Sequence, residues 1–199
     1  MDTVRYLIAL VTIVMLPPAV LLWYAIHPFA GFWRRFGPGW TYAVLGIPAV
    51  AMMVGLFAVR DRLLGTDFGT SYPLTAAGIL CVTVAMVIAM KRKKYLTFRI
   101  LAGIPELSRR AEPGKLLNQG IYASIRHPRY VELVLAMLGY ALIANYLGSY
   151  FLFILFVPAI YLIVLMEERE LRERFGAEYE EYCRRVPRFI PRYRPSSER

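Results

Sequence analysis

In this chain of 199 residues, Ala, Val, Ile, Leu, Met, Phe, Trp, Tyr and Cys fill 58% of the positions and are concentrated in blocks. Soluble domains average ~45–50% apolar residues even when glycine is counted, so the composition indicates an integral membrane protein. The net charge of +10 comes from bases at the edges of the apolar blocks, which favours contact with anionic lipid headgroups and argues against nucleic-acid binding.

Five apolar runs predict membrane-spanning helices, because a bilayer core needs about 20 apolar residues in a helix. The first three approach that length, whereas the fourth is short. A compact turn at residues 145–149 is expected to join the last two runs into an antiparallel hairpin, with a buried hairpin of a soluble protein as the alternative. The predicted fold class is therefore an all-α polytopic membrane protein with about five transmembrane helices. The runs are Tyr6–Ile26, Trp40–Val59, Pro73–Met90, Tyr130–Ala144 and Tyr150–Met166.

Two units are expected along the chain. Residues 1–90 hold the first three runs without a chemically suggestive motif, and they are interpreted as a scaffold. The first run exceeds a usual signal-peptide core and lacks a small-x-small cleavage pattern before His27, so it is expected to be retained. Residues 91–199 are expected to form the functional half, with a connecting loop, the helical hairpin and a C-terminal helix.

The basic residues predict the orientation in the membrane. Between the third and fourth runs lie Lys91, Arg92, Lys93, Lys94, Arg99, Arg109, Arg110, Lys115, Arg126 and Arg129, and more bases follow Glu168. The opposite face carries only Arg5, Arg60 and Arg62. By the positive-inside rule, the 91–125 loop and the C-terminus are expected to be cytoplasmic and the N-terminus outside.

Metal and disulfide chemistry are not expected. Cys81 falls inside an apolar run and Cys183 in the polar tail, so the two are not expected to pair. The two histidines, His27 and His127, do not have the spacing of a metal site. Neither a glycine-rich phosphate loop nor a nucleophile elbow occurs in the sequence.

Residues 126–130 predict a helix start at the membrane surface. Pro128 suits the first position of a helix, and proline disfavours helical geometry in the preceding residue, so His127 is expected to be extended. A helix N-terminus attracts a carboxylate or phosphate, and Arg126 and Arg129 strengthen that field. An ordinary helix start at the membrane interface is the alternative.

Two glutamates stand out at the end of the fifth run. This run continues into residues 167–182 without a helix breaker until Gly176, which predicts one long helix leaving the bilayer. Glu168 and Arg172 have the spacing of a solvated helical ion pair. Nevertheless, Glu167 and Glu168 sit at the membrane boundary, where a carboxylate needs a cation, and a cationic ligand would supply one.

Taken together, these features resemble a known family. The pattern consists of Gly120-x-Tyr122-x₃-Arg126-His127-Pro128-x-Tyr130, a hairpin, Glu167-Glu168, and Phe175-Gly176-x-Glu178-Tyr179-x₂-Tyr182-x₃-Val186-Pro187-Arg188. It resembles the isoprenylcysteine carboxyl methyltransferase and phospholipid methyltransferase superfamily of integral membrane enzymes. The resemblance covers Leu116 to Pro191.

The resemblance implies a methyltransferase that holds S-adenosylmethionine in a cytoplasm-facing pocket of its C-terminal half. No covalent nucleophile or base is assigned, because the reaction needs alignment and exclusion of water. The acceptor is expected to be a lipid or another lipophilic small molecule that enters from the bilayer. By resemblance, Tyr122, His127, Pro128 and Tyr130 line the cofactor, Gly114, Lys115, Leu116 and Leu117 close over it through backbone contacts, and Glu167 and Glu168 hold its polar end.

One position departs from the family pattern. Isoprenylcysteine enzymes carry an arginine four residues before the glutamate that matches Glu167, where it can neutralise the substrate carboxylate, and here that residue is Ile163. Arg126 is a candidate substitute, as are Arg129 and Arg169. The departure leaves room for phospholipid amines or small thiols as acceptors. A nicotinamide-dependent membrane reductase and a non-catalytic membrane protein remain as alternatives.

Overall fold

The structure, a computed structural model, describes residues 1–26, 28–33, 35–95 and 116–191. These residues are mostly helical, and the one extended pairing among them is a bridge between Asp67 and Tyr146. The helices are α1 (Asp2–Ile26), α2 (Ala30–Trp33), α3 (Gly37–Ala58), α4 (Arg60–Leu64), α5 (Tyr72–Lys93), the 3₁₀ helix η1 (Gly120–Ala123), α7 (Pro128–Ala144), α8 (Leu147–Phe175) and α9 (Ala177–Arg185).

Four of the described helices are long and apolar enough to cross a membrane, namely α1, α3, α5 and α8. Large apolar side chains on their outer faces are exposed, including Ile47 and Leu155, as lipid-facing residues would be. α7 has only 17 residues, or ~25 Å at ~1.5 Å per residue, against a hydrocarbon core of ~30 Å. The all-α polytopic fold is confirmed, and the fourth run is short, as predicted.

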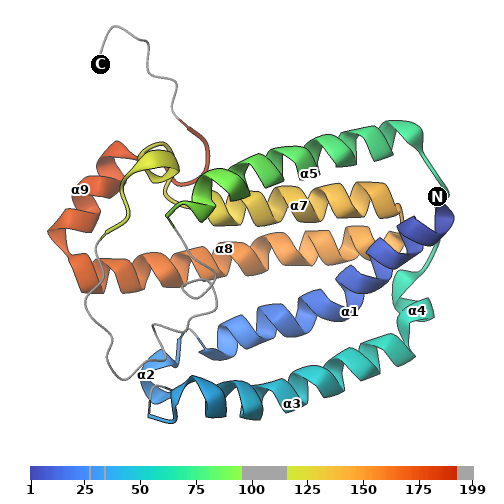
Figure 1. The fold of residues 1–199 in the computed structure, drawn as a ribbon, viewed down its shortest axis with the longest axis horizontal. Coiled ribbons are helices and arrows are strands. Elements are labelled where there is room, and N and C mark those ends of the chain that lie inside the picture. Colours follow the sequence, from blue (N-terminus) through green and yellow to red (C-terminus); the bar gives the residue numbers. More distant parts are fainter. Residues whose placement is uncertain (27, 34, 96–115, 192–199) are drawn as a thin grey trace, which may run out of the picture.

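The long helices lie side by side, with α7 between α5 and α8 and with α3 at the edge beside α1 (Figure 1). α5 and α7 make the most extensive contact, and two glycines explain their close approach. A Cβ atom on Gly78 would lie 2.7 Å from the Gly139 carbonyl oxygen, and one on Gly139 would lie 2.7 Å from that of Gly78. Small residues at such a crossing let two membrane helices pack backbone to backbone.

The turn between α7 and α8 is shorter than predicted. It consists of Asn145 and Tyr146, because α8 already begins at Leu147. Asn145 takes the left-handed conformation, with φ 56°, and its amide donates to the Gly69 carbonyl oxygen at 2.9 Å. This side chain closes the turn without further residues, so the predicted five-residue turn is wrong by three positions.

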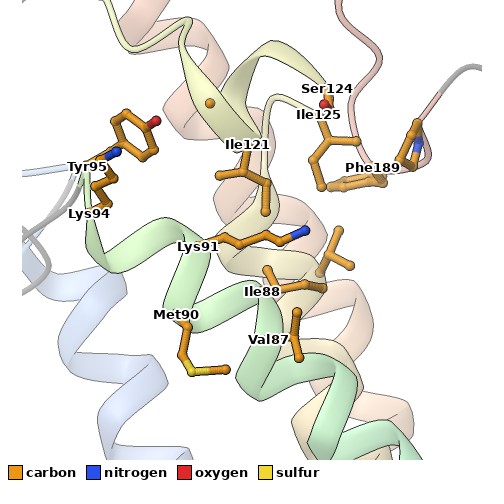
Figure 2. A pocket seen from close by; sticks show the side chains of 13 residues that line it. Val87, Ile88, Met90, Lys91, Lys94, Tyr95, Ile121, Ser124, Ile125 and Phe189 are labelled. Atoms are coloured by element: carbon orange, nitrogen blue, oxygen red, sulfur yellow. The ribbon is translucent and has the colours of Figure 1, made fainter.

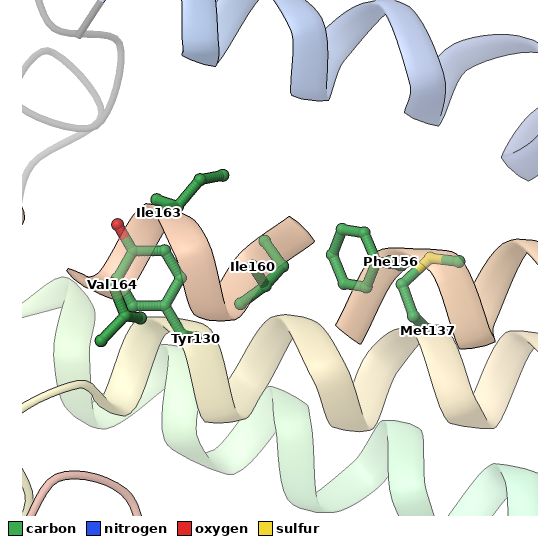
Figure 3. Close-up of a cluster of buried hydrophobic side chains, with 6 residues drawn as sticks. All are labelled: Tyr130, Met137, Phe156, Ile160, Ile163 and Val164. Carbon is green, nitrogen blue, oxygen red and sulfur yellow. The ribbon is translucent and has the colours of Figure 1, made fainter. Parts of the chain in front are cut away.

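α8 continues beyond the apolar run and ends before Gly176, whose φ is +52°, as the sequence indicated. Its apolar part forms a buried cluster with α7 (Figure 3), against which Leu16, Val20 and Trp23 of α1 pack. Tyr130, Met137, Phe156, Ile160, Ile163 and Val164 make up this cluster. The bundle thus has an apolar middle and two polar ends. We call them the Arg5 end, where α7 finishes and α8 begins, and the Glu168 end, where α5 finishes and α7 begins.

Candidate active site

The C-terminal segment pairs with the start of α7 at the Glu168 end. The backbone N–H of Arg126 donates to the Pro187 carbonyl oxygen at 2.9 Å, and that of His127 donates to the Arg188 carbonyl oxygen at 3.1 Å. Pro128 is the first residue of α7, as predicted. His127 is non-helical with φ −121°, but its ψ of 55° is not fully extended. Its backbone N–H is already bonded to the C-terminal segment, which constrains that geometry.

Glu168 is the centre of this end, because its side chain is 0% exposed and yet surrounded by cations. Arg188 donates to both carboxylate oxygens, from Nε at 2.9 Å and from Nη2 at 2.6 Å. Arg126 Nη1 lies 3.1 Å from Oε1, and His127 Nε2 lies 3.0 Å from the same oxygen. The predicted helical partner Arg172 is the most distant, at 3.5 Å. Glu168 therefore ties α8, the start of α7 and the C-terminal segment together.

Arg188 was not assigned a role by the sequence analysis, although it closes the quoted motif. Its hydrogen bonds to Glu168 raise the pKa of its guanidinium above the ordinary value, so it stays charged. The sequence signal that could have identified it was the need for a cation at the boundary glutamates. Arg188 supplies that cation from 20 residues further along the chain.

Glu167 differs from the neighbouring Glu168 in exposure and in hydrogen bonding. Its side chain is 38% exposed, and His127 Nδ1 lies 3.8 Å from its Oε2. Oε2 itself is buried and has no hydrogen-bond partner in the described part of the chain. The Tyr130 hydroxyl lies beside this carboxylate and interacts with it by a hydrogen bond, so the open position is at Oε2 alone. Since buried polar atoms are almost always partnered in native proteins, Glu167 retains an open acceptor.

Tyr122 provides a second open group next to Glu167. It is buried in η1, and its hydroxyl lacks a hydrogen-bond partner among the residues that the structure describes. Burial raises the pKa of the Tyr122 phenol well above the ordinary value. The positive charge of Arg92 lowers that pKa and the negative charge of Glu167 raises it further, so Tyr122 lies near both groups.

Arg92 and Glu132 form an ion pair that the sequence analysis missed. Arg92 Nε donates to Glu132 Oε2 at 2.8 Å, and Nη2 donates to Oε1 at 3.2 Å, which joins α5 to α7. Both side chains are largely buried. The signal was present in the sequence, because Glu132 is the one acidic residue of the fourth apolar run and a carboxylate there requires a partner.

The other predicted site residues are placed as follows. Pro128 is buried at the start of α7, Leu116 packs against the α9 tyrosines, and Leu117 is exposed. Ile163 is 2% exposed within the apolar cluster of α7 and α8, away from solvent. Gly114 and Lys115 lie outside the described residues, as does most of the predicted 91–125 loop.

A cavity of about 650 Å³ opens between the end of α5, η1 and the C-terminal segment (Figure 2). The Phe189 ring forms part of its wall and also contacts the His127 ring, with centroids 6.0 Å apart. The predicted cofactor residues that the structure describes do not line this cavity. The lining residues are Val87, Ile88, Met90, Lys91, Lys94, Tyr95, Gly120, Ile121, Ser124, Ile125, Val131, Phe189 and Pro191.

The open groups at this end have the chemistry to hold a ligand that carries a positive charge. Glu167 Oε2 is an anionic acceptor for an ammonium or sulfonium group, and the Tyr122 hydroxyl can donate or accept. Direct methyl transfer requires such a held ligand and a dry reaction site, without a covalent nucleophile. Among the described residues, no cluster of three or more His, Cys, Asp or Glu side chains could hold a metal ion.

Comparisons with known proteins point to the same half of the chain. A family model described as "Phospholipid methyltransferase" matches residues 72–178, more than half of the sequence. The protein-S-isoprenylcysteine O-methyltransferase of Schizosaccharomyces pombe is 35% identical over 85 residues, which are 42% of this chain and 36% of that protein. The chain thus spans about a third of the length of this curated relative. No solved structure matches the chain significantly.

Proposed function

The chain belongs to the phospholipid methyltransferase family, and from this premise we propose that it transfers a methyl group from S-adenosylmethionine to a lipophilic acceptor at the membrane surface. One observation carries the proposal. The buried and unpartnered Glu167 Oε2, next to the equally unpartnered Tyr122 hydroxyl, lies inside the matched region. The name of the curated relative, an isoprenylcysteine O-methyltransferase, supports the same reaction class.

The proposed mechanism relies on positioning. S-adenosylmethionine, when bound, supplies an electrophilic methyl group on a sulfonium. Glu167 holds the cationic end of the ligand, and Tyr122 and Tyr130 fix its orientation beside that carboxylate. Glu168 does not contact the ligand in this scheme, since its oxygens are already occupied by Arg188, Arg126 and His127. It keeps His127 and the start of α7 in place.

We propose that the acceptor approaches through the cavity beside η1. The cavity wall is mostly apolar, with Lys91 and Lys94 at its α5 side, and this combination suits a lipid with an anionic headgroup. Ile163 lies in the apolar cluster and offers no cation to an acceptor carboxylate. Arg126, the sequence-based substitute, is already bonded to Glu168. Because the family's carboxylate-binding position is apolar here, we expect a phospholipid amine, whose phosphate Lys91 and Lys94 can meet, to be methylated better than an isoprenylcysteine.

The bases at the ends of α5 and α8 support a cytoplasmic position for the Glu168 end. A single cysteine probe at Lys94, in a variant with Cys81 and Cys183 replaced, tests this orientation in intact cells. An impermeant reagent is expected to leave the probe unmodified. Ready labelling would reverse the proposed topology.

The function is tested with purified protein, radiolabelled S-adenosylmethionine and a membrane extract, followed by identification of the labelled product. We expect label in a lipid fraction with the wild-type protein and much less with Glu167→Gln. Glu178→Gln, a carboxylate on α9, serves as the matched control. Failure to bind S-adenosylmethionine, or binding of a nicotinamide cofactor in its place, would contradict the proposal.

A further inference from the structure

The Arg92–Glu132 pair leaves one donor unused. Arg92 is 7% exposed, and its Nε and Nη2 are both directed at the Glu132 carboxylate, at 2.8 and 3.2 Å. Nη1 is also buried, but it has no hydrogen-bond partner within the described ranges. Guanidinium N–H groups form a rigid fork, so fixing two nitrogens also fixes the direction of the third. The pair thus presents an oriented donor without a partner.

Tyr122 connects this donor to the proposed site. η1 packs against the end of α5, where the Tyr122 ring lies 6.4 Å from that of Tyr95, and the Tyr95 backbone N–H donates to the Arg92 carbonyl oxygen at 2.9 Å. The charges of Arg92 and Glu167 act on the pKa of this phenol in opposite directions, in keeping with that placement. All three side chains carry a buried polar atom without a partner in the described structure, namely Arg92 Nη1, the Tyr122 hydroxyl and Glu167 Oε2. Such atoms are rare in native proteins, and a phenol hydroxyl together with two charged groups in this state indicates a ligand that completes their hydrogen bonds.

The chemistry of the three atoms specifies the ligand group. Arg92 supplies a donor suited to a carboxylate, and Glu167 supplies an acceptor suited to an ammonium group. An α-amino acid carries both groups on one carbon, whereas a simple phosphate would leave Glu167 without a partner. The methionyl end of S-adenosylmethionine is such an amino acid.

Arg126 is the competing candidate, because its Nε is also buried and unpartnered in the part of the chain described. However, its Nη1 contacts both Glu168 and the Cys183 thiol. Burial raises the pKa values of Tyr179 and Tyr182, and the charge of Arg126 opposes both shifts. Arg126 is therefore held by Glu168 and by Cys183 of α9, whereas Arg92 is held by Glu132 at the end of α5 beside η1.

We propose that Arg92 is a cofactor-binding residue, whose Nη1 donates to the methionyl carboxylate of S-adenosylmethionine while Glu167 accepts from the ammonium group. This inference rests on the proposed function. It assigns the carboxylate to the end of α5, in place of the helix N-terminus that the sequence favoured. Glu132 then acts as a positioning residue that orients the Arg92 fork.

The test compares the affinities of the purified protein for S-adenosylmethionine and for its decarboxylated analogue, by calorimetry in detergent. Arg92→Gln alone would strand the buried Glu132 carboxylate, so the informative variant is the double substitution Arg92→Gln/Glu132→Gln. Glu132→Gln alone keeps the guanidinium, and Lys93→Gln, an exposed base on the same helix, controls for lost charge. Thermal unfolding verifies that each variant is folded.

The wild-type protein and Lys93→Gln are expected to bind S-adenosylmethionine about 10- to 100-fold more tightly than the decarboxylated analogue. In the double variant this preference should fall to near unity, while Glu132→Gln keeps most of it. A folded double variant that keeps the full preference would overturn the inference, as would loss of the preference in Arg126→Gln alone. If the wild-type protein binds neither ligand, the proposed function itself fails.

Discussion

Both polar ends of the bundle bury charged side chains, but they differ in how completely the polar atoms are hydrogen-bonded. At the Arg5 end, a guanidinium only 1% exposed has all three nitrogens bonded: Nε to the Ala144 carbonyl oxygen at 3.1 Å, Nη1 to Asp2 at 3.1 Å, and Nη2 to Asp67. At the Glu168 end, Glu168 is equally saturated, yet Glu167, Tyr122 and Arg92 keep open atoms around it.

This difference indicates that the Arg5 end stabilises the fold, whereas the Glu168 end can also bind a ligand. A closed polar network stabilises a fold and has nothing left to offer a ligand, whereas an open one costs free energy until a ligand completes it. The Ser149 hydroxyl is the one buried side-chain atom near the Arg5 end without a partner in the described residues, and it carries no charge. Paired substitutions at the two ends can therefore separate effects on stability from effects on ligand binding.

Glu168→Gln is expected to have the largest effect. The substitution keeps the shape but removes the counter-charge of Arg126 and Arg188, and breaking a buried ion pair in this way costs about 3–5 kcal/mol. The free energy of unfolding in detergent measures this loss. Glu173→Gln on the same helix removes an exposed pair with Arg169 and should cost below ~0.5 kcal/mol. Similar stabilities for the two variants would show that the Glu168 cluster does not hold the fold.

Arg5→Gln should destabilise the protein by about 2–3 kcal/mol without altering cofactor affinity. The loss is smaller than at Glu168 because Asp2 and Asp67 are partly exposed and water can solvate them once the guanidinium is gone. Unfolding and calorimetry on the same preparation separate the two quantities, with the exposed Arg62→Gln as the control. A marked fall in cofactor affinity would show that the ends are coupled.

Glu167→Gln should show the reverse behaviour, with stability near that of the wild type and S-adenosylmethionine affinity reduced by about 1–3 kcal/mol. The reason is that Oε2 has no partner to lose within the described protein, whereas the ligand loses an anionic acceptor. Glu178→Gln is the matched control on α9. Equal and small effects of both substitutions on calorimetric affinity would return Glu167 to an ordinary surface role.

The sequence predicted those features that depend on local composition. Apolar runs set the long helices, Pro128 sets the start of α7, and Gly176 ends α8, since each effect acts within a few residues. The family resemblance assigned Tyr122, His127 and Glu167 to one cofactor site; the structure brings His127 within 3.8 Å of Glu167, and the role of the three residues stays a prediction.

Long-range side-chain pairings could not be predicted in the same way. Arg92 reaches Glu132 across 40 residues, and Arg5 reaches Ala144 across 139. Both pairings depend on which helices pack against each other in the bundle. Glu132 interrupts an apolar run and therefore needs a partner, but which residue that partner is becomes fixed only when the helices pack. The same packing placed Ile163 in the apolar cluster, where an introduced arginine would be buried among apolar side chains, one helical turn from Glu167.

The smallest effects are expected from removing one tyrosine hydroxyl at each end. The Tyr150 hydroxyl donates to Asn145 Oδ1 at 2.7 Å, so Tyr150→Phe should cost about 1 kcal/mol of unfolding free energy and leave cofactor affinity unchanged. The Tyr122 hydroxyl has no partner among the described residues, so Tyr122→Phe should change stability by less than ~0.5 kcal/mol and weaken S-adenosylmethionine binding by about 3- to 10-fold. The unfolding free energy and the cofactor affinity of both variants, measured side by side, test this prediction.

Because the two substitutions are chemically identical, any difference between their effects comes from the surroundings of the two hydroxyl groups. If Tyr122→Phe instead loses as much stability as Tyr150→Phe and binds the cofactor normally, its hydroxyl serves the fold, and the contrast between the open and closed ends does not hold.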